Sequence, residues 1–141
     1  MNIAIRYYTR SGNTKKLAYA VAEAVSVEAK DITIPLSEKA DILFFGSSYY
    51  AFDADDAVKQ FITDNKDNIG KIVCFGTSAM MKSMRKPIVK IAETVGITVA
   101  DEEFHCRGQF GKIHNGRPNE KDMEDIKRFA TAILADQKGE V

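Results

Sequence analysis

Apolar segments of strand length alternate along the chain with segments whose apolar residues recur at helical spacing. Five short apolar runs, the second more polar than the rest, predict strands at residues 3–8, 28–34, 42–49, 71–77 and 98–105. Four longer segments carry their apolar residues on one helical face and predict helices at 13–25, 55–65, 84–95 and 120–135. Continuous apolar strands separated by helices are typical of parallel strands buried on both faces. The sequence therefore predicts one α/β domain.

The order of these elements departs from strict alternation at one point. The strands predicted at 28–34 and 42–49 are separated only by PLSEKAD, residues 35–41. Because this linker is short, we expect a loop or a single turn where the other connections have a helix.

Length and composition narrow the class of protein. The 141 residues fit a single domain, and 45% of them are hydrophobic. The 20 basic and 20 acidic residues leave no net charge, which argues against a nucleic-acid binder or a membrane-surface protein. No apolar window of about 18 residues predicts a membrane span, and the first residues lack the pattern of a secretory signal.

The cysteines and histidines do not have the spacing of a known site. Cys74 and Cys106 are too few and too far apart for a disulfide framework or a zinc site, so we expect a reducing cytoplasm. His105 and His114 lack the spacing of metal ligands, and we expect no metal.

The polar loop between the first strand and the first helix is the strongest functional signal. It comprises Thr9, Arg10, Ser11, Gly12, Asn13 and Thr14. In such a sheet, ligands bind beyond the carboxyl ends of the strands, and the free N–H groups of a helix N-terminus favour an anion. Hydroxyl and amide side chains add hydrogen-bond donors, and Gly12 allows a tight turn. The loop therefore predicts a phosphate cradle.

The spacing within this loop limits what it can bind. A plain helix start, capped by Ser11 or Asn13, remains the alternative. The loop matches neither the Walker P-loop nor the dinucleotide motif, because it has a single glycine. We therefore expect one terminal phosphate rather than a pyrophosphate.

The same segment resembles the signature of the flavodoxin family. A strand is followed by a hydroxyl-rich loop with a glycine and then by a helix, and the matching positions are Thr9, Gly12, Thr14, Ala18 and Val21. The alternation of elements agrees with that family over nearly the whole chain. The resemblance implies a doubly wound five-stranded parallel sheet, flavodoxin-like, with strand order 2-1-3-4-5, and FMN as the cofactor. Arg6 departs from the family pattern, because an apolar residue usually stands there.

The resemblance also implies that the flavin lies between the loops after the third and fourth strands. A flavin needs a flat, mostly apolar slot with aromatic faces. The implied contacts are Ser48, Tyr49, Tyr50, Ala51 and Phe52 in the first loop, Thr77, Ser78, Ala79 and Met80 in the second, and Gly108 after the last strand. A tyrosine is favoured over Phe52 for stacking, since both tyrosines stand nearer the strand end. Core packing of these aromatics is the alternative.

Two features of the second loop differ from many flavodoxins. It lacks an aromatic residue, so Met80 or Met81 would cover that face of the ring. It leads into Lys82, Arg85 and Lys86 in a chain without excess acid. Cations beside the ring would make the reduced, anionic flavin less unfavourable than in strongly acidic flavodoxins.

Two other functions on related patterns are not favoured. The segment HCRGQFGK, residues 105–112, begins like a cysteine-phosphatase loop but has Lys112 where that loop requires arginine. A phospho-receiver domain needs an aspartate at the end of its third strand, where this chain has Ser47 and Ser48.

The sequence thus predicts an FMN-dependent electron carrier that acts between redox partner proteins, with no catalytic residue of its own. We expect a monomer that binds neither nucleic acid nor membrane. An NAD(P)H-dependent flavin or quinone reductase on the same fold is the alternative, and a flavodoxin-like regulator without flavin is a third possibility. Fold analogy alone does not separate these functions.

Overall fold

The computed structural model describes residues 1–9, 12–48, 56–78, 83, 85–108, 114 and 116–139. At its centre is a five-stranded parallel sheet in the order β2-β1-β3-β4-β5, which confirms the expected strand order. The strands are β1 (Ile3–Tyr8), β2 (Ala29–Asp31), β3 (Ala40–Ser48), β4 (Ile69–Ser78) and β5 (Thr98–Arg107). Because β1 lies between β2 and β3, the winding of the sheet reverses at this strand.

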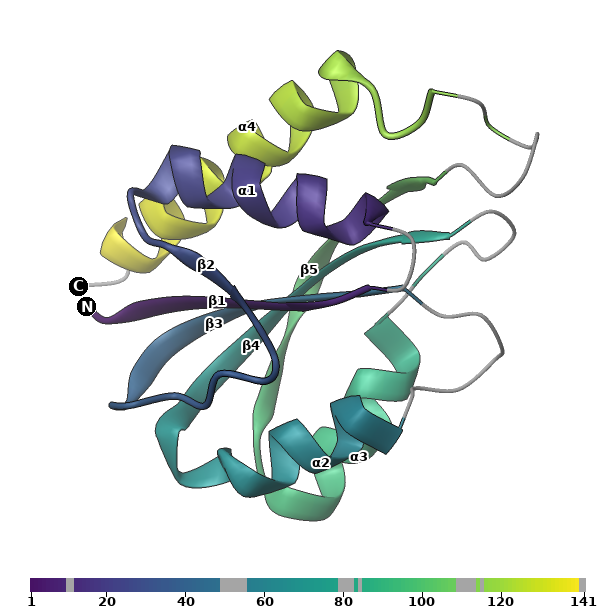
Figure 1. The fold of residues 1–141 in the computed structure, drawn as a ribbon. Helices are drawn as coiled ribbons and strands as arrows, with labels where there is room; N and C mark the ends of the chain where they lie inside the picture. Colours follow the sequence, from purple (N-terminus) through teal and green to yellow (C-terminus); the bar gives the residue numbers. More distant parts are fainter. Residues whose placement is uncertain are drawn as a thin grey trace.

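Helices cover both faces of this sheet (Figure 1). The helices α1 (Asn13–Val25) and α4 (Glu120–Gly139) pack together on one face, and α2 (Asp56–Asp64) and α3 (Arg85–Val95) lie on the other. A short 3-10 turn, η1 (Lys66–Asn68), joins α2 to β4. The four predicted helices are confirmed, and α4 continues beyond its predicted end at residue 135. None of the helices in the described part of the chain is both long and apolar enough to cross a membrane.

Each face of the sheet has its own apolar core, because successive strand residues point to opposite sides. Phe44 and Phe75 are fully buried on the face of α1, where they pack with Leu17. Phe45 points to the other face, and its ring stacks on that of Phe61 from α2, with centroids 5.8 Å apart. A continuous apolar strand therefore supplies two cores at once, as its sequence predicts.

The second strand is shorter than the predicted 28–34, because a turn begins at Asp31. The Asp31 carboxylate accepts the N–H of Thr33 at 2.9 Å, and the Asp31 carbonyl accepts the N–H of Ile34 at 3.0 Å. These two bonds take the place of hydrogen bonds between strands, and aspartate commonly stabilises turns in this way. The prediction of strand up to Ile34 was therefore wrong by three residues.

The connection from β2 to β3 has no helix, as predicted, and polar side chains hold it on the sheet instead. Leu36 lies in the core with Phe45. The N–H of Leu36 donates to Asn65 Oδ1 at 2.9 Å, and Asn68 Nδ2 donates to the carbonyl of Leu36 at 3.4 Å. These bonds satisfy backbone groups that a helix would otherwise have paired internally.

Arg6 anchors the same connection from within β1. Its side chain is 6% exposed, and its Nε donates to the carbonyl of Ile34 at 2.8 Å. Its Nη2 donates to the carbonyl of Pro35 at 3.1 Å, and its Nη1 to the carbonyl of Ile5 at 2.9 Å. Burial lowers the pKa of Arg6 from its ordinary value. The presence of Arg6 in a buried strand is thus explained by its hydrogen bonds to the connection between β2 and β3, which has no helix.

Candidate functional site

The carboxyl ends of the central strands lie level at one edge of the sheet. The register pairs Tyr8 with Ser47, Ser48 with Thr77, and Ser78 with Arg107. The segments that follow β1, β3, β4 and β5 therefore all start from the same edge. This is the edge at which open α/β sheets bind their ligands.

The start of α1 lacks a side-chain cap at its N-cap residue and an acidic residue in its first turn. Gly12 is the N-cap residue, with φ 89°, and no side-chain hydrogen bond caps the helix. The N–H of Gly12 itself donates to Thr9 Oγ1 at 3.0 Å. The first turn has no acidic residue, but it does contain Lys15 and Lys16. The alternative in which Asn13 is the N-cap is wrong, because Asn13 is already the first helical residue.

Two other helices of the same protein begin differently. The Arg85 N–H at the start of α3 donates to Ser83 Oγ at 3.2 Å. At the start of α4, the Asp122 N–H donates to Asn119 Oδ1 at 3.0 Å, and the Asn119 N–H donates to Asp122 Oδ2 at 2.8 Å. The α1 terminus thus combines an N-cap residue without a side chain, two lysines in its first turn and no acid there, which favours a bound anion.

Three predicted site residues meet beside this terminus. Thr14 and Thr77 are 0% and 2% exposed, and their hydroxyl oxygens lie 3.2 Å apart. A Cβ atom on Gly108 would lie 2.9 Å from Asn13 Nδ2 and 3.0 Å from Thr77 Cβ, so a larger residue there would force these side chains to shift. The N–H of Gly108 donates to the carbonyl of Ser78 at 3.4 Å. The loop after β1, the end of β4 and the residue after β5 are therefore packed together.

The space beside Gly12 differs from the space beside Gly108. A Cβ atom on Gly12 would meet no atom of the described residues within 4 Å. Gly12 is therefore required by its positive φ and not by crowding.

Sequence reasoning missed two polar residues at this edge. Ser47 Oγ and His105 Nε2 are buried without a hydrogen-bond partner, the two such side-chain atoms found among the described residues. The register places Ser47 and His105 in one row, on either side of Gly76. Burial lowers the pKa of His105, and the Arg107 charge lowers it further, so the imidazole stays neutral at physiological pH. The only sequence signal was a change from apolar to polar residues at the end of each strand.

The cysteine at the start of HCRGQFGK does not have the chemistry of a phosphatase nucleophile. Burial raises the pKa of Cys106 to about 12, and the Asp122 carboxylate acts in the same direction. Burial likewise raises the pKa of Cys74 to about 12. Since the thiolate is the reactive form, both side chains are inert thiols at neutral pH.

Arg85 does not lie free at the rim of the site, as the sequence interpretation required. Its Nε donates to the carbonyl of Ala100 at 2.7 Å, and its Nη2 lies 3.3 Å from Asp101 Oδ1. The guanidinium is thus directed at β5, and Asp101 partly neutralises it. Arg85 therefore no longer supports the proposed effect of rim cations on the flavin. Lys82 lies outside the described residues, so its part in that effect stays a prediction.

Several predicted contacts lie outside the part of the chain that the structure describes. They are Arg10, Ser11, Tyr49, Tyr50, Ala51, Phe52, Ala79, Met80 and the side chain of Ser48. The aromatic face of the predicted flavin slot therefore stays a prediction. Within the described residues, no three His, Cys, Asp or Glu side chains group as metal ligands do.

Comparisons with known proteins agree with this fold. A family profile described as a flavodoxin domain matches residues 4–96. Among solved structures, a flavodoxin from the domain Archaea superposes with a TM-score of 0.79 at 20% identity, covering 98% of this chain and 99% of that one. The Flv1 flavodiiron core from Synechocystis sp. PCC6803 gives 0.76 at 16% identity, covering 100% and 37%.

A third solved structure is described as a complex with FMN. This flavoprotein from Lactobacillus acidophilus NCFM gives a TM-score of 0.60 at 18% identity, covering 75% of this chain and 92% of that one. A search of curated proteins returned no match of comparable significance.

Proposed function

The chain belongs to the family of flavodoxin domains, and on that basis we propose that it binds FMN and carries electrons between redox partner proteins. FMN supplies one- and two-electron redox chemistry when bound. The chain's own residues bind the cofactor, orient it and determine how much water reaches it. The description of one structural neighbour as an FMN complex supports the choice of cofactor.

The observation that carries the proposal is the start of α1. Its N-cap residue, Gly12, has no side chain, and the first turn contains Lys15 and Lys16 but no acidic residue, so the positive end of the helix dipole is not offset within that turn. A phosphate group is the ligand that would compensate this charge. The described residues therefore fit the phosphate end of FMN, at the loop that the sequence predicts.

The neighbouring residues would hold that loop in place. The contact between Thr14 and Thr77 ties α1 to β4, and Gly108 packs against Asn13 and Thr77. Such contacts preorganise a binding loop before the ligand arrives, which lowers the entropic cost of binding. We propose that Tyr49 or Tyr50 then covers one face of the ring, as the sequence predicts.

The carrier function is favoured over the reductase function by the extent of the structural match. The match with the archaeal flavodoxin covers 98% of this chain and 99% of that protein. In the flavodiiron core, by contrast, the chain covers only 37% of a larger protein. We further propose a cytoplasmic monomer, in keeping with the free, buried thiols of Cys74 and Cys106.

Two measurements on the FMN-loaded protein separate the carrier from the reductase. The protein is first mixed with NADH or NADPH, and flavin absorbance is followed without any partner. It is then reduced with dithionite and mixed with cytochrome c. A carrier leaves NAD(P)H unoxidised and passes electrons to cytochrome c. Rapid flavin bleaching by NAD(P)H alone would support the reductase instead.

A further inference from the structure

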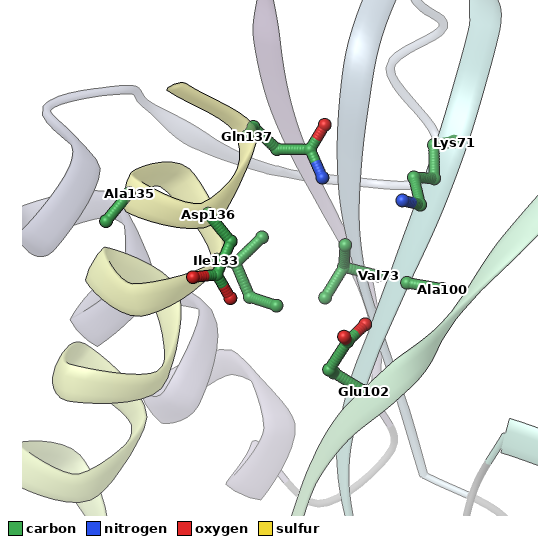
Figure 2. Close-up of a pocket in the computed structure, with 8 residues that line it drawn as sticks. All are labelled: Lys71, Val73, Ala100, Glu102, Ile133, Ala135, Asp136 and Gln137. Atoms are coloured by element: carbon green, nitrogen blue, oxygen red, sulfur yellow. The ribbon is translucent and has the colours of Figure 1, made fainter. Parts of the chain in front are cut away.

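A pocket lies at the opposite end of the sheet from the proposed cofactor loops. It has a volume of about 430 Å³ and lies between α4 and the strands β4 and β5 (Figure 2). Pockets of this size commonly hold small molecules. Its floor is apolar and consists of Val73, Ala100 and Ile133, which are 1%, 4% and 6% exposed. Lys71 and Val73 are near the start of β4, whereas the cofactor loop follows its end.

Polar side chains of both charges surround this apolar floor. Lys71, Glu102, Asp136 and Gln137 all line the pocket. In Figure 2 the ammonium of Lys71 and the amide of Gln137 lie toward one end, and the carboxylates of Glu102 and Asp136 lie toward the other. Donor groups and acceptor groups are thus separated along the pocket.

These four side chains make no hydrogen bond or ion pair with any of the described residues. Charged residues on the adjacent surface behave differently. Lys121 pairs with Asp125 at 3.1 Å, and Lys127 pairs with Glu23 at 3.1 Å. Lys71 has two carboxylates around the same pocket but pairs with neither, so within the described part of the chain these charges have no partner.

An irregularity in β5 gives the pocket its shape. Val99 pairs with Ile72 and Glu103 pairs with Cys74, so residues 100–102 of β5 oppose the single residue Val73. This bulge lets both Ala100 and Glu102 face the pocket. Bulges of this kind re-aim side chains and occur preferentially near functional sites.

Arg85 holds the bulge from the other face of the sheet. It donates to the carbonyl of Ala100 at 2.7 Å and to the Asp101 carboxylate at 3.3 Å. Those two residues belong to the bulge itself. The shape of the pocket is therefore fixed by a side chain that does not line it.

From this arrangement we propose that the pocket binds a short zwitterion, with an ammonium group and a carboxylate at opposite ends of an apolar body. The ligand carboxylate pairs with Lys71 and Gln137, and its ammonium pairs with Glu102 and Asp136. The apolar body covers Val73, Ala100 and Ile133. Burial of the apolar body is non-directional, so the charged ends determine selectivity.

The test is a titration of the ¹⁵N-labelled full chain followed by NMR, with 5-aminopentanoate as the probe. Pentylamine and pentanoate, which each lack one charge, are titrated in parallel. We expect saturable shifts at residues 71–73, 100–102 and 133–137, and an affinity for 5-aminopentanoate about tenfold or more above either analogue. Absence of shifts at these residues, or equal affinity for all three molecules, would overturn the proposal.

Substitutions at the two ends of the pocket give a second test. Glu102→Gln and Lys71→Met should each weaken binding of 5-aminopentanoate about tenfold, as expected for loss of one charge-assisted hydrogen bond. Glu93→Gln and Lys90→Met, exposed on α3 at the other face, are matched controls and should change nothing. If Glu102→Gln fails to fold, Asp136→Asn on α4 replaces it. Unchanged affinity in the pocket variants would contradict the assignment.

Discussion

The hydroxyl oxygens of Thr14 and Thr77 lie 3.2 Å apart in a buried contact that joins the first turn of α1 to the end of β4. These residues are 63 positions apart in sequence. Both were predicted to contact the cofactor, and their contact shows that the protein already uses these hydroxyls to join two parts of the site. The first turn of α1 and the carboxyl end of β4 are therefore joined directly, without any ligand.

This contact should be measurable as a coupling energy. Thr14→Val and Thr77→Val each remove one hydroxyl with little change of shape, and we expect the double variant to lose less stability than the sum of the single variants. The expected coupling is about 0.5–1.5 kcal/mol, the net contribution of a hydrogen bond. Urea unfolding of the apoprotein measures it, with Thr131→Val on the exposed face of α4 as control. Strictly additive losses would mean that the two hydroxyls do not interact.

Arg6 should contribute to stability through the connection that it fastens. Arg6→Met keeps a long apolar side chain but removes the donors to Ile34 and Pro35. The free energy of unfolding should fall by about 2–4 kcal/mol, because two or three carbonyls lose a charged donor. Lys39→Met, an exposed change in the same connection, should cost less than about 0.5 kcal/mol. If Arg6→Met lowered the free energy of unfolding as little as Lys39→Met does, water would be replacing the guanidinium as the donor to these carbonyls.

Arg85 should act on β5 rather than on the flavin. Arg85→Ala removes the bond to the carbonyl of Ala100, so we expect amide shifts at residues 99–103 and a loss of about 1–2 kcal/mol in stability. Lys86→Ala, the exposed neighbour, is the matched control. The reduction potential of the FMN-loaded protein should be the same in both variants. A large drop in potential for Arg85→Ala alone would restore the rim-cation interpretation.

The two cysteines should resist alkylation in the folded protein. Burial raises the pKa of Cys74 and of Cys106 to about 12, so at pH 8 only about one thiol in ten thousand is ionised. Iodoacetamide should label neither residue in buffer and both in urea, as read by mass spectrometry. Between the ordinary cysteine pKa and 12, the unfolded chain releases protons that the folded chain retains, so stability should fall as pH rises through that window. Fast labelling of native Cys106 would reopen the nucleophile interpretation.

The strands, the helices and their order could be predicted because each depends on a local pattern. Continuous apolar runs predict buried parallel strands, and amphipathic periodicity predicts the helices that cover them. Even the helixless connection after β2 followed from the length of a short linker. The position at which this connection begins, Asp31, could not be predicted. It depends on the hydrogen bond from the Thr33 N–H to the Asp31 carboxylate, which ends the strand early.

The contacts within the site could not be predicted because they join residues far apart in sequence. Arg6 binds carbonyls 28 and 29 residues away, and Arg85 reaches a bulge 15 residues away. Nothing in the sequence near Arg85 indicates that bulge, so the sequence predicted only a cation near the rim and not its bonds to β5. The polar loop itself was recognisable, because hydroxyls and a glycine at a strand-to-helix joint have a local physical reason.

The central claim is that the start of α1 binds the phosphate of FMN. The most direct measurement is a fluorescence titration of the apoprotein with FMN and with riboflavin, which lacks only the phosphate. We expect FMN to bind at least about a hundredfold more tightly, because two or more charge-assisted hydrogen bonds are lost with the phosphate. Dissociation constants within about twofold of one another would contradict it, and would mean that the uncapped terminus at Gly12 does not bind the cofactor.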